Sequence, residues 1–150
     1  MPRIRRSDLP DGLFHVTTRG CHGQRVFHDD DDRRLLLSLL AVVVGRHGWD
    51  CHAFCLMGTH YHLVIDTTTE NLSGGMHYLN GEYADRFNRR HGRGGHVFGA
   101  RFASWVIRDE VHYERTLEYV LANPVRAGLV SDWADWPWSG ARGVRLVGDI

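Results

Sequence analysis

The segment Gly58-Thr59-His60-Tyr61-His62-Leu63-Val64-Ile65 combines two histidines with the residue types of a β-strand. Successive side chains of a strand point to opposite faces, so the histidines share one face with Val64, while Tyr61 and two aliphatic residues share the other. The Cα atoms of two such histidines lie roughly 7 Å apart, which allows both rings to bind one metal ion. The alternative is a pair of polar side chains on a solvated sheet face.

A second element far downstream favours the metal interpretation. Asp109 is expected to cap a helix that ends at Asn123, because a residue before proline is pushed out of helical geometry. Tyr119 and Asn123 lie one turn apart on this helix and off its apolar stripe, so a phenol and an amide oxygen that can bind a hard cation project together. The apolar stripe consists of Tyr113, Leu117, Val120 and Leu121.

Length and composition predict a single globular domain over residues 1–150, since the 150-residue chain is 43% hydrophobic and 24% charged. The sequence contains neither a run of roughly 18 apolar residues nor the apolar stretch of a signal peptide, so we expect a cytoplasmic protein without membrane association. Association with the nucleoid is a separate expectation, which depends on DNA binding. The formal net charge is zero, so the position of the charges decides whether nucleic acid can bind. Every one of the 18 basic residues is arginine.

The order of the predicted elements is strand, helix, strand, strand, helix, strand, helix. This order predicts a ferredoxin-like α+β fold with an antiparallel sheet, in which the histidine strand is central and the third helix crosses its active face. The first strand follows a turn at Pro10-Asp11-Gly12. The other segments are strand Leu13–Arg19, helix Asp31–Arg46, strand Trp49–Met57, the histidine strand, helix Leu72–Arg90, strand Phe102–Ile107 and the helix that Asp109 caps.

Two other groups of residues could bind metal, but a structural role is favoured for both. The four aspartates from Asp29 to Asp32 precede an apolar block, as residues at a helix N-terminus do, and that helix should be well buried. Cys51 and Cys55 are expected to share a strand face with Ala53. Small core residues are favoured over a zinc site there, because structural zinc sites prefer cysteine pairs on tight turns.

Arginines gather at the end of the second predicted helix and in the glycine-rich loop after it, where Asp85 is the acidic residue among them. Such a loop can follow a nucleic-acid backbone, although a solvated charged loop fits equally well. The residues expected to contact DNA here are Arg86, Arg89, Arg90, Arg93 and Arg101.

Several motifs in one order resemble the REP-associated tyrosine transposases, within the single-tyrosine HUH (IS200-like) transposases. The resemblance extends from the first strand through Trp136-Pro137-Trp138-Ser139. Its motifs are His60-Tyr61-His62, Asn88-Arg89-Arg90-His91-Gly92-Arg93, Gly95-His96-Val97-Phe98, Arg101-Phe102 and the segment Tyr119-Val-Leu-Ala-Asn123-Pro124-Val125-Arg126-Ala127-Gly128-Leu129-Val130.

The resemblance implies that His60, His62 and Asn123 hold a divalent ion, that Tyr119 attacks single-stranded DNA with hairpin structure, and that Arg126 joins the DNA-binding arginines. The product would be a 5′-phosphotyrosine and a free 3′-hydroxyl. Imidazole and oxygen ligands suit Mg²⁺ or Mn²⁺, although zinc also binds imidazole. The family uses a monomer or a homodimer that exchanges the tyrosine helix.

Two other functions remain open. A metal-dependent nuclease or phosphodiesterase could use water with the same histidines, and Tyr119 would then be dispensable. A domesticated DNA-binding module could keep the fold without turnover.

Overall fold

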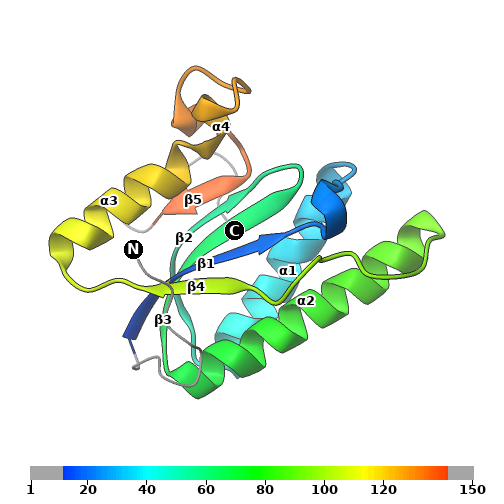
Figure 1. Ribbon diagram of the computed structural model, residues 1–150, viewed down its shortest axis with the longest axis horizontal. Helices are drawn as coiled ribbons and strands as arrows, with labels where there is room; N and C mark the ends of the chain where they lie inside the picture. Colours follow the sequence, from blue (N-terminus) through cyan, green and yellow to red (C-terminus); the bar gives the residue numbers. More distant parts are fainter. Residues whose placement is uncertain (1–11, 142–150) are drawn as a thin grey trace.

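The computed structural model describes residues 12–141, which form one antiparallel five-stranded sheet with helices on both faces (Figure 1). The strand order is β4-β1-β3-β2-β5. The turn expected at Pro10-Asp11 and the tail after Ala141 lie outside the described residues. The elements are β1 Gly12–Arg19, η2 Cys21–Gly23, α1 Asp30–Arg46, β2 Asp50–Leu56, β3 His60–Thr67, α2 Thr69–His91, β4 Ala103–Val106, α3 Glu110–Leu121, α4 Asn123–Arg126, η3 Trp133–Asp135 and β5 Ser139–Ala141.

The histidine strand β3 is central, as predicted. It pairs with β1 on one side and β2 on the other, so that His62 lies opposite Thr17 and Cys55. The predicted α+β fold, its antiparallel sheet and the order of the seven main elements are therefore confirmed.

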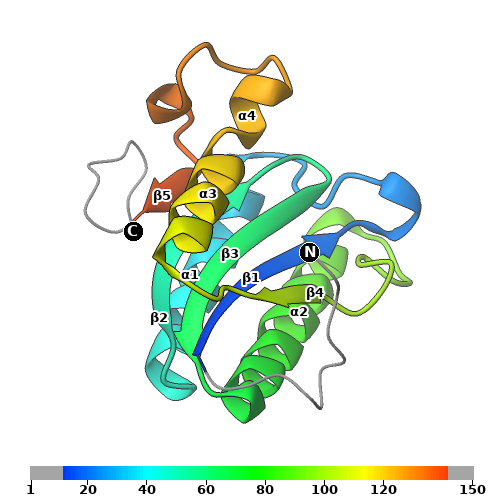
Figure 2. The ribbon, with the colours of Figure 1, turned by 60° about the vertical axis from the view of Figure 1, so that its left-hand side comes forward.

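The two faces of the sheet carry different helices, as Figure 2 shows with α3 in front of the sheet and α1 and α2 behind it. The larger core lies between the sheet and the α1–α2 pair, and it contains Tyr61, Leu63 and Ile65 of β3. A smaller core under α3 contains Val64 and Val120. The alternation expected in β3 is confirmed, although the histidine face is partly packed and not wholly solvated.

The aspartates before α1 act at the start of the helix, as expected. Asp29 is the N-cap and accepts a hydrogen bond from the backbone N–H of Asp32 at 3.0 Å. The expectation that this helix is well buried holds for one side only, because Val42 is 40% exposed while Leu40 and Val43 are fully buried. The inner side of α1 packs against α2 and the sheet, and Val42 lies on the outer side.

A β-bulge in β2 overturns the prediction that Cys51, Ala53 and Cys55 share a face. The register with β3 shifts between Cys51 and Ala53, so Cys51 turns to the larger core and Cys55 to the smaller one. Burial raises the pKa of both thiols to about 12. Two protonated thiols on opposite faces cannot bind one zinc ion, which leaves them as core residues.

Two features at the C-terminal end differ from the expectation. Helix α3 ends at Leu121, and Asn123 begins the short helix α4, because Pro124 cannot donate an N–H but fits the first turn of a new helix. The chain after Asp132 also returns to the sheet and adds β5 to the edge of β2. The indole N–H of Trp136 fixes this return by donating to the carbonyl of Leu56 at 3.1 Å.

Two glycines of α2 provide a matched test of the packing between this helix and its neighbours. A Cβ at Gly75 would lie 2.4 Å from the Trp49 ring, whereas a Cβ at Gly81 would meet nothing within 4 Å. We expect Gly75→Ala to lower the free energy of unfolding by about 1–3 kcal/mol through overpacking. Gly81→Ala should raise it by about 0.5–1 kcal/mol. Urea unfolding measures both, and equal effects of the two substitutions would contradict this packing.

Candidate active site

The two histidines of β3 lie side by side on the sheet face that α3 crosses. Their ring centroids are 5.1 Å apart and their planes are nearly perpendicular, at 85°. His60 is partly exposed at the end of the strand, and His62 is 2% exposed. Adjacent strands therefore hold one imidazole rigidly, and the other lies at the rim.

The ring of His62 is oriented by neighbours on β1. Its Nδ1 lies 2.9 Å from Thr17 Oγ1 and 3.0 Å from His15 Nε2. Its Nε2 is buried and has no hydrogen-bond partner in the part of the chain that the structure describes. A buried polar atom without a partner is costly, and hydrogen bonds at Nδ1 with a free Nε2 are what metal-ligating histidines show.

Burial keeps the paired imidazoles of this site neutral. It lowers the pKa of His62 to about 2, with the nearby charges of His15 and His60 acting in the same direction. Burial, followed by the charge of His112, lowers the pKa of His15 to about 4. The pKa of His60 is also lowered, chiefly by burial. Metal binding needs neutral imidazole, so these rings are ready ligands at pH 7.

Asn123 lies against the second histidine. Its amide N–H groups donate to the carbonyls of Tyr119 and Val120, at 3.3 and 3.1 Å, and its side chain also forms a hydrogen bond with His60. His60 Nδ1 in turn contacts Thr59 Oγ1 at 3.1 Å. Two imidazoles and one amide oxygen, with a buried nitrogen left unpaired, form a donor set that fits a divalent metal ion.

Tyr119 faces these histidines from α3. Its ring centroid is 6.0 Å from the ring of His62 and 6.0 Å from that of His15, both edge to face. The side chain is 50% exposed, so its hydroxyl can reach a polymer substrate. The Arg126 guanidinium lies 4.4 Å from the centre of the Tyr119 ring, and Arg126 Nη2 donates to the Tyr119 carbonyl at 2.8 Å.

The competing tyrosines are enclosed in the larger core. Tyr61 is fully buried and donates to Asn80 Oδ1 at 2.5 Å, and Tyr83 is fully buried and donates to the carbonyl of Val26. Burial raises the pKa of both phenols. Neither hydroxyl can approach a phosphodiester without unfolding, which leaves Tyr119 as the accessible tyrosine beside the histidine pair.

The sequence interpretation missed the residues that complete this face. His15 contacts His62, and Trp105 packs on His15 with ring centroids 5.3 Å apart. These two residues, with Tyr119, line both a cavity of about 530 Å³ towards His112 and one of about 380 Å³ towards Arg101. The alternation of side chains along β1 indicates that these residues share one face of the sheet, since His15, Thr17 and Arg19 alternate with apolar or buried residues.

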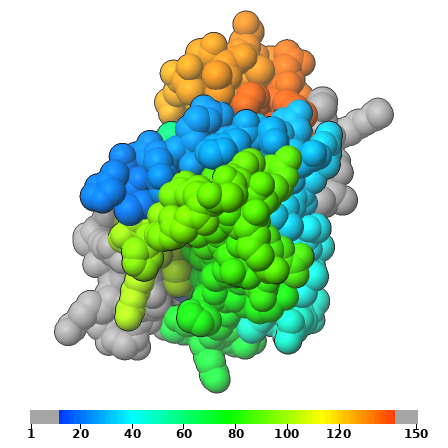
Figure 3. All heavy atoms as spheres, turned by 90° about the vertical axis from the view of Figure 1, so that its right-hand side faces the viewer, coloured from blue at the N-terminus to red at the C-terminus, as the bar shows by residue number. Residues whose placement is uncertain are grey.

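The predicted DNA-binding arginines are distributed over two regions. Arg101 and Arg126 are near Tyr119: Arg101 lines the cavity beside it, and Arg126 covers its ring. The remaining four lie at and just after the C-terminal end of α2, the helix that faces the viewer in Figure 3. These four are Arg86, Arg89, Arg90 and Arg93.

The sequence suggested that Asp85 alone opposes these arginines, but the structure shows further acidic partners. Arg89 pairs with Asp85 at 2.7 Å and Arg86 with Glu82 at 3.4 Å, both in exposed i,i+4 pairs of small energetic weight. Arg90 is bound by three carboxylates at the start of α1, and it therefore has structural partners that the spacing along α2 does not reveal.

Comparison with known proteins identifies the family. The model of the family described as "Transposase IS200 like" matches residues 10–123, most of the chain. The chain therefore belongs to the IS200-like transposases, as its motifs suggested.

Individual relatives agree with this assignment. A Haemophilus influenzae protein described as a REP-associated tyrosine transposase is 28% identical over 98 residues, which cover 58% of this chain and 56% of that protein. The chain thus matches just over half the length of that relative. A solved structure of a REP-associated tyrosine transposase bound to a REP hairpin has the same fold, with a TM-score of 0.74, 20% identity and coverage of 93% of this chain and 82% of that one.

A crystal structure described as that of a transposase from Deinococcus radiodurans R1 is more distant. It has a TM-score of 0.54 and 15% identity, and the alignment covers 79% of this chain and 95% of that one. Among residues 12–141, no helix is both long and apolar enough to cross a membrane.

The two histidines should differ in what their removal does to the fold. We expect His60→Ala and His62→Ala each to weaken Mn²⁺ binding by at least about tenfold, measured by isothermal titration calorimetry. His60→Ala should leave the melting temperature nearly unchanged, whereas His62→Ala should cost roughly 1–3 kcal/mol because it leaves a buried hole beside Thr17. His77→Ala, at an exposed position of α2, is the control. Unchanged Mn²⁺ affinity in both variants would contradict the ligand assignment.

Proposed function

We propose that this chain cleaves and rejoins single-stranded DNA through a covalent bond between Tyr119 and the 5′-phosphate at the break. The observation that supports this most directly is the position of an accessible phenol 6.0 Å, ring to ring, from a buried imidazole whose Nε2 has no partner among the described residues. Family membership supports the same chemistry. In this proposal residues 1–150 act as one catalytic domain.

In the proposed reaction the Tyr119 oxygen forms a bond to phosphorus while the bond between phosphorus and the 3′-oxygen breaks. The phenol loses its proton and the departing 3′-oxygen gains one, so the products are a 5′-phosphotyrosine and a free 3′-hydroxyl. The phosphodiester energy is retained in the tyrosyl ester, and attack by a 3′-hydroxyl reverses the step and rejoins a strand.

His60, His62 and Asn123 are proposed to hold the divalent ion that this chemistry requires. When bound, Mg²⁺ or Mn²⁺ would withdraw charge from the phosphate oxygens and favour attack by an anionic nucleophile. The neutral rings and the hydrogen bonds at Nδ1 of both histidines support this role.

Arg126 and Arg101 are proposed to position the DNA strand. Arg126 restrains the Tyr119 ring from one side and presents a guanidinium next to the reacting phosphate, while Arg101 lies at the other wall of the adjoining cavity. The structural relative with a bound REP hairpin supports hairpin DNA as the substrate of this chain.

Removal of the Tyr119 hydroxyl alone should abolish the reaction without affecting the fold. We expect Tyr119→Phe to lose covalent adduct and strand cleavage with Mn²⁺ and a labelled hairpin oligonucleotide, while hairpin affinity and melting temperature stay near wild type. Tyr61→Phe should still form adduct, although it should be less stable because Asn80 loses a buried partner. Undiminished cleavage by Tyr119→Phe would favour a metal-dependent hydrolase that uses water. Hairpin binding by the wild type without any cleavage would favour a non-catalytic DNA-binding module.

The arginines at the end of α2 should separate into residues that bind DNA and one that stabilises the fold. Replacing Arg89 and Arg93 with alanine should weaken hairpin binding and flatten the log–log salt dependence by roughly 0.7–0.9 for each phosphate that is no longer neutralised. Arg90→Ala should instead lower the melting temperature and leave the salt slope nearly unchanged. The reason is that the carboxylates of Asp29 and Asp32 lose their guanidinium partner. Weaker binding with an unchanged slope in the double variant would show that Arg89 and Arg93 do not bind phosphate.

A further inference from the structure

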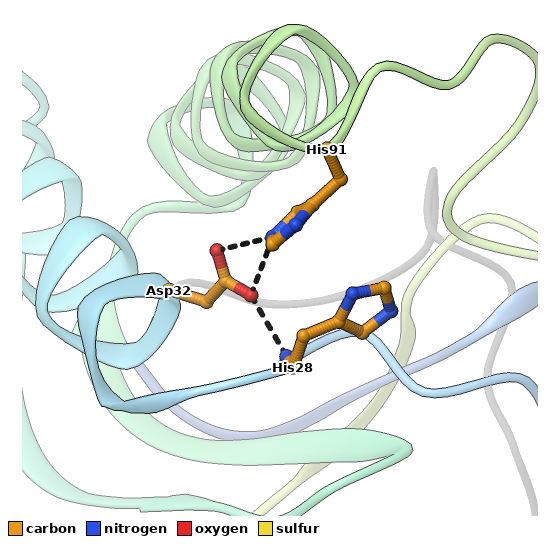
Figure 4. Close-up of side chains that lie close together, drawn as sticks. All are labelled: His28, Asp32 and His91. Carbon is orange, nitrogen blue, oxygen red and sulfur yellow. Dashed lines mark hydrogen bonds and ion pairs between the residues drawn. The ribbon is translucent and has the colours of Figure 1, made fainter.

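A second cluster of metal-ligating side chains lies on the other side of the sheet from Tyr119, where α2 ends against the start of α1 (Figure 4). His28 precedes α1, Asp32 is in the first turn of α1, and His91 is the last residue of α2. One ligand atom from each of the three residues lies within 4.8 Å of the other two. Three side chains from two segments, the start of α1 and the end of α2, therefore lie close together.

The distances within the cluster are close to those of ligands on one ion. His91 Nε2 lies 2.9 Å from both carboxylate oxygens of Asp32, a hydrogen-bond distance. Two ligands bound to Zn²⁺ at about 2.0–2.1 Å in tetrahedral geometry are about 3.3 Å apart, so this pair would have to separate by roughly 0.4 Å to exchange its hydrogen bond for the ion. The ring of His28 lies next to that of His91, with centroids 4.5 Å apart, and its ligand nitrogen is within 4.8 Å of the other two ligand atoms, so it would have to move further than they do to reach the ion.

The carboxylate at the centre is held by its own set of hydrogen bonds. The Asp32 side chain is completely buried, and its oxygens accept from the His28 backbone N–H at 2.8 Å and from Arg90 Nη1 at 2.6 Å. Hydrogen bonds to a ligating carboxylate fix its orientation and are typical of the residues around a metal site.

The guanidinium groups around this cluster do not balance the carboxylates on their own. The ion pairs bring four carboxylates to three guanidinium groups, and the fourth partner is the His91 imidazole, 2.9 Å from Asp32 Oδ2, which carries a charge only when it is protonated. With neutral His91, one negative charge remains beside the two imidazoles. A divalent cation at the cluster would compensate that charge, whereas a further arginine could not enter the buried space around Asp32. The carboxylates belong to Asp29, Asp30, Asp31 and Asp32, and the guanidinium groups to Arg33, Arg34 and Arg90.

We propose that His28, Asp32 and His91 bind a divalent transition-metal ion of the Zn²⁺ type, separate from the His60–His62 site. Two imidazoles and one carboxylate are a common zinc donor set, and they are a poor match for Mg²⁺, which prefers oxygen ligands and water. The ion would fasten the end of α2 to the start of α1. Because Gly92 and Arg93 follow His91 directly, it would also fix the origin of the arginine-bearing loop.

The test uses a chain in which His60 and His62 are both alanine, so that the first site cannot contribute. Isothermal titration with Zn²⁺ should show one ion per chain, and Zn²⁺ should raise the melting temperature. Adding His28→Ala should lower Zn²⁺ affinity at least about tenfold and abolish the thermal shift. His28 is exposed, so this variant should fold. His96→Ala, an exposed histidine of the neighbouring loop, is the matched control and should change neither quantity.

Two results would overturn the proposal. One is a folded double-alanine chain that binds no Zn²⁺, and the other is a Zn²⁺ affinity that falls equally in the His28 and His96 variants. If the double-alanine chain does not fold, the wild type serves instead, and His28→Ala should lower its Zn²⁺ stoichiometry by one. Absorption of bound Co²⁺ gives a second measure of the ligand set. None of these readouts depends on DNA cleavage, so failure here leaves the proposed transposase chemistry untouched.

Discussion

The pairing of β3 on both of its edges is the constraint on which the rest of the structure depends. β1 and β2 fix the backbone of the histidine strand, and the alternation along that strand places Tyr61 in the larger core and His62 under α3. A shift of one residue in this register would exchange the two faces and bury the wrong side chains. The same register brings Thr17 and His15 of β1 to Nδ1 of His62. One set of backbone hydrogen bonds therefore determines both the core and the orientation of the candidate ligands.

Helix α3 supplies the other half of the site. Its packing explains how Tyr119 can be exposed to solvent and still be held beside the histidines. Val120, the next residue, is fully buried in the smaller core, which anchors the turn that carries the phenol. Helix α3 ends at Leu121, and the break at Ala122 directs the Asn123 side chain towards the end of this helix. Its amide therefore donates to the last carbonyls of α3 and forms a hydrogen bond with His60. The irregular helix end contributes directly to the site.

The sequence was sufficient for the fold and for the position of Tyr119, because these follow from local periodicity and from motifs with fixed spacing. The stripe of α2 that includes Leu79, Tyr83 and Phe87 is buried as expected. Features that depend on tertiary contacts were not predictable in this way. The bulge that separates Cys51 from Cys55, the strand β5 and the pairing of Arg90 with the carboxylates of α1 each join segments far apart in the chain. His15 was also missed: the alternation along β1 indicates which face it is on, but its contact with His62 depends on the register between β1 and β3.

The most direct test of the central claim is to map the protein–DNA adduct trapped with a labelled hairpin and Mn²⁺. Trypsin cleaves this chain only after arginine, since the sequence has no lysine, and Tyr119 is the one tyrosine of the peptide Thr116–Arg126. Tyr61 and Tyr83 both fall in the peptide His47–Arg86. Tandem mass spectrometry should find the nucleotide on Thr116–Arg126, attached to Tyr119. A nucleotide on Tyr61 or Tyr83 instead would contradict the account, because it would require a phenol from the closed core to reach the DNA. A nucleotide on Tyr78, the third tyrosine of the peptide His47–Arg86, would contradict the assignment of Tyr119 equally.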